Sequence, residues 1–418
     1  MLLTICLAEL LERYGNYLIA ALLPLFLNEH ERLTPAVALR VVGYYLALGY
    51  AGGVAGGLIA DRFLGYRLAT RLGTVLFGLG ALLLTASRPG TLYPALALLV
   101  LGSGCFKPAL SAWLGTLYAA GDVRQGAGFA WFYFAANIGA VVAPFIGGAL
   151  RTRYSWPLAF ATTALAFALC LLVVLVGQIG APAATARAAP ASDPTAGAAG
   201  RPDAAPDARR WRTLLVLLAV LVLFAMVYGQ SGGALLFFAR DRVDRRLLGW
   251  VIPPDFFASV PAALVLILTA LQQALWRSLA RRCRVPRPGT AMAVGMLASS
   301  AAFALLAAVA ATQGEATPRP LLSALWVVAA LTFLTVGEVL VVPVGMALVA
   351  QSAPPRKGAL AQGLLSAALA IGLALAGEAG RFIAPWGAAR FFAAAAVLPV
   401  LGALLLAGAG RQPGTTAS

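Results

Sequence analysis

The sequence predicts an all-α membrane protein with about twelve transmembrane helices in two six-helix bundles. Of its 418 residues, 61% are hydrophobic and only 11% are charged, and the mean hydropathy is +0.87. A soluble globular chain carries about 25% charged residues. Apolar runs long enough to cross a bilayer also recur along the whole chain, separated by turn residues or charges. Together these observations predict a multi-pass membrane protein.

The predicted spans fall into two equal groups. Residues 180–210 separate them, and this segment is rich in Ala, Pro and Asp without apolar periodicity, as is typical of a flexible linker. We therefore expect an N-terminal bundle at 1–179, a cytoplasmic linker at 180–211, a C-terminal bundle at 212–410 and a tail at 411–418. The predicted spans are residues 2–27, 38–60, 69–87, 92–119, 126–150, 156–179, 212–238, 255–280, 288–312, 320–352, 358–377 and 386–409.

The net charge of +16 comes mostly from arginines at the ends of apolar runs. This pattern indicates membrane topology and contact with anionic lipids, and it argues against a nucleic-acid partner. The bias of these arginines towards alternate loops predicts that both termini are cytoplasmic. The four cysteines lie far apart, and no phosphate loop, nucleophile motif or metal-ligand spacing is present in the sequence. We therefore expect no enzyme activity, no metal and no cofactor.

The first span carries three ionisable residues, Glu9, Glu12 and Arg13. One charge near the middle of a span costs about 3 kcal/mol or more, so three need a reason. Their i, i+3 and i+4 spacing places all three on one helix face, where Glu9 can pair with Arg13. That face must turn towards protein or a water-filled cavity. The residues leave two readings open, a functional charge site and a buried ion-pair cluster that only locks helix packing.

Lys107 in the fourth span and Glu338 in the tenth are the other charges placed well inside apolar runs. A buried ammonium either loses its proton or finds a carboxylate. Because one residue lies in each half of the chain, we expect the two to meet, or nearly meet, across a central cavity. A carboxylate in such a cavity can exchange its ion pair for a proton, which predicts proton coupling. A static salt bridge between the halves is the alternative.

Six motifs occur in order along the chain: Glu9-x-x-Glu12-Arg13-Tyr14-x-x-Tyr17, Gly56-Gly57-x-x-x-Asp61-Arg62-x-x-Gly65-x-Arg67, Gly104-x-x-Lys107-Pro108, Phe132-Tyr133-x-x-x-Asn137-x-Gly139, Gln230-x-Gly232 and Glu338-x-x-x-x-Pro343-x-Gly345. Taken together in order and spacing, these motifs resemble those of the proton-dependent oligopeptide transporters of the major facilitator superfamily. The resemblance covers nearly the whole chain except the linker and tails.

The resemblance implies a major facilitator superfamily fold and alternating access, with proton-coupled uptake of di- or tripeptides or similar solutes. It implies proton coupling by Glu9, Glu12, Arg13 and Glu338, substrate binding by Tyr17, Tyr50, Lys107, Asn137, Gln230 and Glu338, and gating by Asp61, Arg62 and Arg67. The expected partners are a peptide-like solute, protons and membrane lipids, and the expected state is a monomer. Two alternatives stay open: a divergent member that moves another small organic solute or a drug-like compound without standard proton coupling, and a non-transporting membrane receptor or scaffold.

The chain also departs from the family pattern at five positions. Where many relatives have a first-helix arginine and a seventh-helix acid, this chain has Ala20 and Gly229. Losing both together removes a salt bridge without leaving an unpaired charge. Asn16, Val260 and Leu365 replace a tyrosine, an asparagine and a tryptophan of the pattern. These changes predict a cavity with fewer polar groups.

Overall fold

A computed structural model describes residues 1–59, 63–88, 90–118, 122, 124–179, 207–247, 249–282, 286–312, 322–352 and 358–410. The predicted gating residues Asp61 and Arg62, most of the predicted linker and the predicted tail 411–418 lie outside these ranges. Arg67 is the one predicted gating residue inside them, near the start of a helix.

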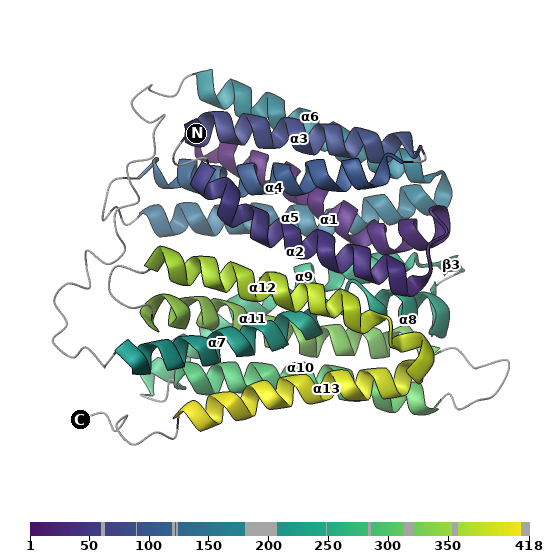
Figure 1. The fold of residues 1–418 in the computed structure, drawn as a ribbon, viewed down its shortest axis with the longest axis vertical. Coiled ribbons are helices and arrows are strands. Elements are labelled where there is room, and N and C mark those ends of the chain that lie inside the picture. The colour runs from purple at the N-terminus through teal and green to yellow at the C-terminus, as the bar shows by residue number, and fades with distance from the viewer. Residues whose placement is uncertain are drawn as a thin grey trace. The chain divides into compact units, whose positions relative to one another are not determined.

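Among its described residues, the first half of the chain contains six long helices, as predicted (Figure 1). A short π-helix, η1, follows the first of them, and Pro24 in the last turn before it has no backbone N–H to donate. The elements are α1 (Leu2–Leu25), η1 (Phe26–His30), α2 (Pro35–Ile59), α3 (Gly65–Ala86), α4 (Leu92–Gly115), α5 (Arg124–Arg153) and α6 (Trp156–Ile179).

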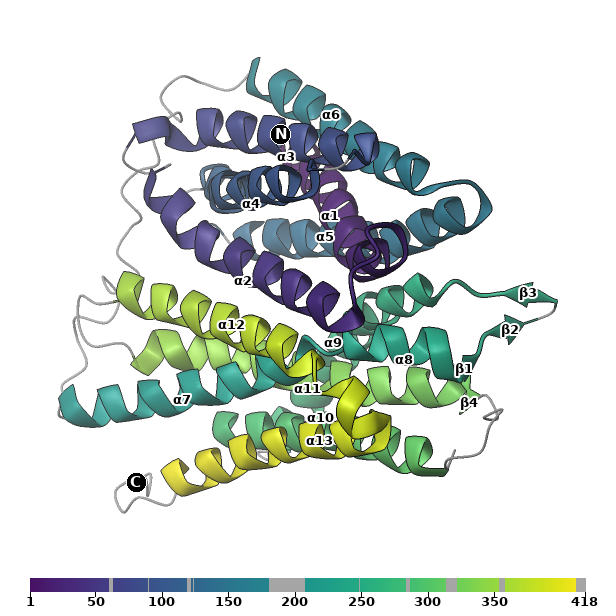
Figure 2. The ribbon, with the colours of Figure 1, turned by 45° about the vertical axis from the view of Figure 1, so that its right-hand side comes forward.

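The described part of the second half is also helical, with four two-residue strands in its loops (Figure 2). β1 pairs with β4 in parallel, and β2 pairs with β3 as a small hairpin. The elements are α7 (Asp207–Tyr228), α8 (Ala234–Arg242), β1 (Val243–Asp244), β2 (Arg246–Leu247), β3 (Trp250–Val251), η4 (Pro254–Ala258, a 3₁₀ helix), α9 (Ser259–Arg281), α10 (Pro288–Thr312), β4 (Leu322–Ser323), α11 (Ala324–Ser352), α12 (Gly358–Gly380) and α13 (Ile383–Gly410).

Within the described residues, eleven helical stretches are long and apolar enough to cross a membrane. They correspond to the predicted spans from the second to the twelfth. α1 is not among them because every stretch of spanning length within it includes Glu9, Glu12 and Arg13. With 24 residues, α1 is nevertheless about 36 Å long, which is sufficient to cross the hydrocarbon core. The expected all-α membrane architecture is confirmed.

The seventh predicted span, residues 212–238, is not one continuous helix. α7 begins at Asp207, before the predicted boundary, and ends at Tyr228, and α8 starts only at Ala234. The intervening turn contains three glycines, and glycine is costly in a helix interior. Part of the turn is closed by backbone hydrogen bonds such as Gln230 N to Val227 O at 3.1 Å. The expectation of an unbroken helix is therefore wrong at this point.

Two compact units are defined by the contacts within the chain. Unit 1 contains residues Met1–Leu33, Tyr45–Ser192 and Pro253–Ala263, and unit 2 contains Thr34–Tyr44, Asp193–Ile252 and Leu264–Ser418. Unit 1 thus contains mainly residues of the first half of the chain and unit 2 mainly residues of the second half, and one short segment of each half is grouped with the other unit.

In unit 1, α1 packs against α5 and α6, while α3 packs against α4 and α6. The close approach of α5 to α1 requires Gly139, because a Cβ atom there would lie 2.9 Å from the Tyr14 nitrogen and 3.1 Å from the Arg13 Cβ. Gly139 thus allows α5 to lie directly against the charged turn of α1. The tyrosine itself donates a hydrogen bond to Thr162 Oγ1 of α6 at 2.9 Å.

In unit 2, α7 packs against α11, α12 and α13, and α10 packs against α11 and α13. The core of this unit is built from Leu, Val, Met and Phe side chains on these helices. Leu365, one of the five departures from the family pattern, is 4% exposed and belongs to this core. A tryptophan in its place would have to find space among tightly packed neighbours.

Candidate functional site

The charges of the first span form a compact cluster in unit 1. Glu9 and Glu12 are 2% and 0% exposed. Arg13 Nε lies 2.7 Å from Glu9 Oε1, where it donates a hydrogen bond, and 3.6 Å from Glu12 Oε2. The predicted pairing of Glu9 with Arg13 on one face of the helix is therefore present in the structure.

Lys107 of α4 joins this cluster. Its Nζ lies 3.8 Å from Glu12 Oε1. Two carboxylates thus face two cations, and the four formal charges balance. Glu12 is central because both cations reach it, while its Oε2 accepts no hydrogen bond from the described residues. A buried carboxylate with an unfilled acceptor is energetically costly, which makes Glu12 well suited to exchange a partner or to bind a proton.

Asn16 is a member of the cluster that the sequence did not identify. Its Nδ2 donates to Glu12 Oε1 at 2.6 Å and lies 3.3 Å from the Glu12 carbonyl oxygen. In the sequence this residue stands out only as a departure from the tyrosine of the family pattern. The signal was nevertheless present, because Asn16 follows Glu12 by four residues and so lies on the same helix face.

Glu338 lies in α11 of unit 2. The Tyr228 hydroxyl, at the end of α7, donates a hydrogen bond to its carboxylate. Its Oε2 accepts no hydrogen bond from the part of the chain that the structure describes. Lys107 and Glu338 belong to different units. Lys107 pairs with Glu12 in its own unit. The expected contact between Lys107 and Glu338 stays a prediction.

The predicted substrate-binding residues differ in how exposed their side chains are. Tyr17 and Tyr50 are 40% and 48% exposed, and thus accessible. Asn137 is nearly buried and donates to the Tyr133 carbonyl oxygen in its own helix at 2.8 Å. Gln230, in the turn between α7 and α8, is 3% exposed and donates to the Ala376 carbonyl oxygen of α12 at 2.9 Å.

The tight packing around Gly229 explains why this position of the seventh span has no acidic side chain. A Cβ atom there would lie 2.7 Å from the Ala376 Cβ of α12. Any side chain at this position therefore requires α7 and α12 to move apart.

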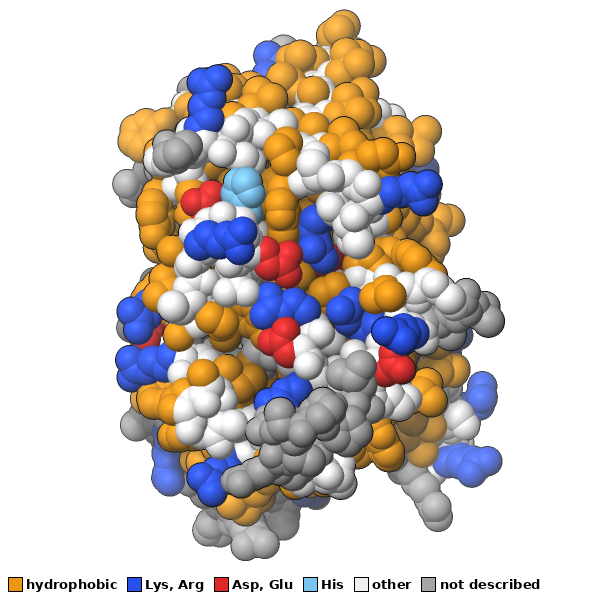
Figure 3. Space-filling model, turned by 90° about the vertical axis from the view of Figure 1, so that its right-hand side faces the viewer, with side chains coloured by type: hydrophobic (Ala, Val, Ile, Leu, Met, Phe, Trp, Pro, Cys, Tyr) orange, Lys and Arg blue, Asp and Glu red, His pale blue; other side chains and the backbone are white. Residues whose placement is uncertain are grey.

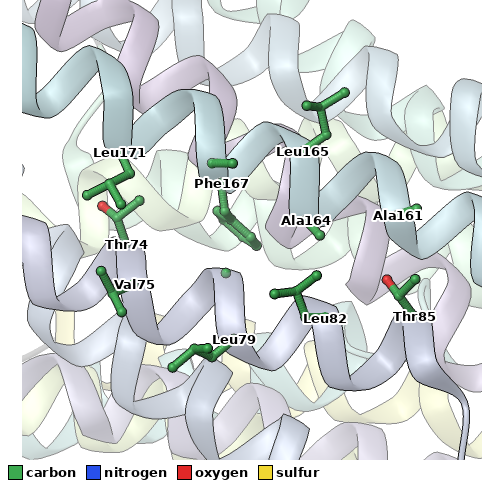
Figure 4. A pocket seen from close by; sticks show the side chains of 12 residues that line it. Thr74, Val75, Leu79, Leu82, Thr85, Ala161, Ala164, Leu165, Phe167 and Leu171 are labelled. Atoms are coloured by element: carbon green, nitrogen blue, oxygen red, sulfur yellow. The ribbon is translucent and has the colours of Figure 1, made fainter.

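A separate groove runs between α3 and α6 (Figure 4). None of its twelve lining residues is charged, and Thr74 and Thr85 are its polar side chains. Such a lining cannot bind the charged ends of a peptide, so this groove does not compete with the charge cluster as a substrate site. Its apolar surface is instead suited to lipid acyl chains.

Among the described residues, no three His, Cys, Asp or Glu side chains are arranged to hold a metal ion. Acidic and basic side chains do gather on the molecular face drawn in Figure 3, where histidine is also visible. The chain has one histidine, His30, which is exposed and stacks on Phe26 with ring centroids 4.8 Å apart.

Comparison with known proteins relates this arrangement to transporters. The sequence model of the POT family matches residues 67–181 and 203–385. Peptide transporter YePEPT of Yersinia enterocolitica is 26% identical, with 90% of this chain and 86% of that protein covered. Dipeptide and tripeptide permease A of Escherichia coli K12 is 25% identical, with 83% of this chain and 77% of that protein covered.

Solved structures show the same fold. A mutant of the peptide transporter POT in complex with sulfate has a TM-score of 0.88 and 23% identity, with 98% of this chain and 94% of that chain covered. A complex of a mutant of that transporter with alafosfalin has a TM-score of 0.85 and 25% identity, with the same coverage. The fold and its intramembrane charges define a multi-pass membrane transporter and not an enzyme. The chain belongs to the POT family.

Proposed function

We propose that this protein is a proton-coupled symporter that takes up di- and tripeptides or similar small peptide-like solutes by alternating access. The similarity of the chain to a peptide transporter and to a dipeptide and tripeptide permease supports this substrate class. We further propose that it acts as a monomer in the inner membrane with both termini in the cytoplasm.

The position of Glu12 is the main structural support for the proposal. Its carboxylate is fully buried, and it is shared by Arg13 and Lys107 at 3.6 and 3.8 Å. A proton on Glu12 would remove the negative charge that holds the ammonium. Lys107 would then be free to bind a substrate carboxylate, because a cation released from one anion binds another at little extra cost of desolvation. Proton binding and substrate binding are thereby linked through one residue.

The remaining residues have simpler roles in this proposal. Glu9 keeps Arg13 in place through the 2.7 Å hydrogen bond, so that the arginine remains paired when Glu12 is neutral. Glu338 would bind the amino end of the substrate or exchange protons with it. The exposed rings of Tyr17 and Tyr50 offer apolar surface and a hydroxyl for contacts with the peptide. Asn137 and Gln230 could contact substrate only after breaking their hydrogen bonds to the Tyr133 and Ala376 carbonyl oxygens.

Uptake of a dipeptide into proteoliposomes tests the proposal, with and without an imposed inward proton gradient. Counterflow, which exchanges labelled for unlabelled substrate without net proton movement, separates binding from coupling. We expect Glu12→Gln to lose gradient-driven uptake and keep counterflow, and Lys107→Ala to lose both. Asp122→Asn and Arg277→Ala are matched controls, since they remove a carboxylate and a cation outside the cluster.

Two results would count against the proposal. Uptake by the wild type that does not respond to the gradient would exclude proton coupling, and would favour the divergent transporter without standard coupling. Absence of uptake and counterflow across a library of di- and tripeptides would exclude the substrate class.

A further inference from the structure

The groove between α3 and α6 has the surroundings of a lipid site. Both helices belong to unit 1, and both are long and apolar enough to span a membrane. Two residues on the rim of the groove, Leu82 of α3 and Leu165 of α6, are 55% and 59% exposed. Exposed leucines on membrane-spanning helices contact acyl chains, so the groove opens to lipid.

The groove is long and narrow. It lies between residues 74–85 of α3 and 161–171 of α6 and has a volume of about 440 Å³ (Figure 4). Residues 74–85 rise about 16 Å at about 1.5 Å per residue, which is half of a hydrocarbon core roughly 30 Å thick. The groove therefore has the length of one leaflet.

Small side chains and one buried ring give the groove its shape. Gly78 of α3 faces open space, because an added Cβ would meet only the Phe167 Cβ, at 4.0 Å. Ala164 and Ala168 of α6 contribute short side chains to the lining. Phe167 is 1% exposed and stacks on Phe77 of α3 with ring centroids 4.7 Å apart. This packing fixes the base of the groove while its outer side stays open.

An arginine lies just beyond one end of the groove. Arg71 precedes Val75 and Gly78 by four and seven residues, which places all three on one face of α3. Its Nε donates to Gln178 Oε1 of α6 at 2.6 Å. Gln178 follows the lining residue Leu171 by seven residues, and so continues the same face of α6. The two helices are thus bridged by a cation and an amide one turn or two beyond the apolar lining.

The bridge leaves the charge of Arg71 uncompensated. A neutral amide accepts one hydrogen bond, whereas a guanidinium has five N–H donors and a positive charge. Gln178 is 3% exposed and is held in place by a second hydrogen bond, from its Nε2 to the Arg67 carbonyl oxygen at 3.3 Å. Within the part of the chain that the structure describes, no Asp or Glu forms an ion pair with Arg71. A cation inside a span is stabilised by an anion, and a phosphodiester accepts a guanidinium through two parallel hydrogen bonds.

We propose that α3 and α6 form a binding site for an anionic phospholipid, with its phosphate on Arg71 and one acyl chain in the groove. The site goes beyond the proposed transport function and does not depend on it. Basic residues between transmembrane helices bind lipid headgroups in this way. Because bulk lipid tails can fill an apolar groove equally well, the headgroup charge supplies the selectivity and the groove supplies the fit.

The charges favour a lipid over a second copy of the chain. None of the twelve lining residues is charged, so this face offers no carboxylate to a partner's arginine. In a two-fold symmetric dimer through this face, the two copies of Arg71 would lie at the same depth in the membrane. Like charges at one depth repel, whereas an anionic headgroup neutralises the arginine.

Native mass spectrometry of the purified protein in detergent tests the site without any transport step. The protein is titrated separately with phosphatidylglycerol, which is anionic, and phosphatidylcholine, which is zwitterionic, and the mass identifies the bound lipid and its copy number. We expect the first phosphatidylglycerol to bind wild type roughly tenfold more tightly than phosphatidylcholine. Arg71→Gln should weaken phosphatidylglycerol binding about tenfold and leave phosphatidylcholine binding unchanged, since it removes only the charge. Gly78→Leu fills the groove and should weaken phosphatidylglycerol binding about threefold or more.

Two matched controls should bind phosphatidylglycerol like wild type. Arg277→Gln removes an exposed arginine of α9 that donates to the Gln273 carbonyl oxygen. Gly408→Leu adds the same side chain as Gly78→Leu to a glycine of α13, where no atom lies within 4 Å of an added Cβ.

Four outcomes would overturn the inference. They are equal affinity of wild type for the two lipids, unchanged phosphatidylglycerol binding by Arg71→Gln or Gly78→Leu, displacement of phosphatidylglycerol by an equal concentration of inorganic phosphate, and a dimer whose formation excludes the lipid. Displacement by phosphate would identify a simple anion site, and exclusion by a dimer would identify an interface between copies. The comparison of the two lipids on wild type needs no variant, so it decides the question even if a variant fails to fold.

Discussion

Asn16 Nδ2 lies 2.6 Å from Glu12 Oε1, one turn earlier in the same helix. The contact gives the buried carboxylate a neutral hydrogen-bond donor beside its two cationic neighbours. A neutral donor satisfies an oxygen without adding charge, so it holds Glu12 in place whichever cation is bound. This hydrogen bond is a structural reason for an asparagine at position 16, where the family pattern has a tyrosine.

Replacing Asn16 by leucine should destabilise the protein. The change leaves Glu12 Oε1 with one hydrogen-bond donor fewer in a buried site, which costs about 1.5–3 kcal/mol for a charged acceptor. Thermal unfolding in detergent measures the loss. Combining Asn16→Leu with Glu12→Gln should recover part of it, since the amide needs less compensation than the carboxylate. Strictly additive effects of the two changes would contradict a direct interaction.

Gly43 should not tolerate alanine. A Cβ there would lie 2.6 Å from the Gly377 Cα of α12, and backbone cannot give way as a flexible side chain can. Overpacking of this kind costs about 1–3 kcal/mol. We therefore expect a lower unfolding temperature for Gly43→Ala. Gly49→Ala in the same helix is the control, because no atom lies within 4 Å of its added Cβ, and it should be neutral or slightly stabilising.

The loss of stability caused by Gly229→Ala should be offset by a second substitution at Ala376. Gly229→Ala places two Cβ atoms 2.7 Å apart, and should lower the unfolding temperature. The second change Ala376→Gly removes one of these atoms and should restore much of the loss. If the double variant is no more stable than Gly229→Ala, the steric account of the missing acidic residue is wrong.

The loop before α5 contains an ion pair whose pH behaviour can be predicted. Hydrogen bonds from the Arg124 side chain and backbone lower the pKa of Asp122. A carboxyl group with a pKa lowered on folding contributes stability above its unfolded pKa, and this contribution is lost as pH falls through the folded pKa. We expect the Asp122 carboxyl signal to titrate below the ordinary aspartate range in NMR of selectively labelled protein. Arg124→Ala should return it to that range.

Local parts of the fold and site were predictable from sequence. The pairing of Glu9 with Arg13 needs only helical spacing, and the long apolar runs define the helices. The break after Tyr228 was missed because the apolar composition of that run outweighed its three glycines, although glycine is the usual signal for such a break.

Contacts between distant helices were less predictable. The pairing of Lys107 with Glu12 depends on how α4 meets α1, and hydrophobic periodicity does not specify this. The bond between Arg151 and Asp255 joins residues in opposite halves of the chain, and neither residue belongs to a recognised motif. Such contacts are set by tertiary packing, for which a single sequence carries no local signal.

The charged turn of α1 has a consequence for how the protein enters the membrane. On insertion scales each charged residue at the centre of a helix costs about 2.5–3.5 kcal/mol. α1 emerges from the ribosome before α4 brings Lys107 to Glu12 and before α5 packs beside it. We therefore expect α1 to be stable in the bilayer only after the fourth and fifth spans have been synthesised.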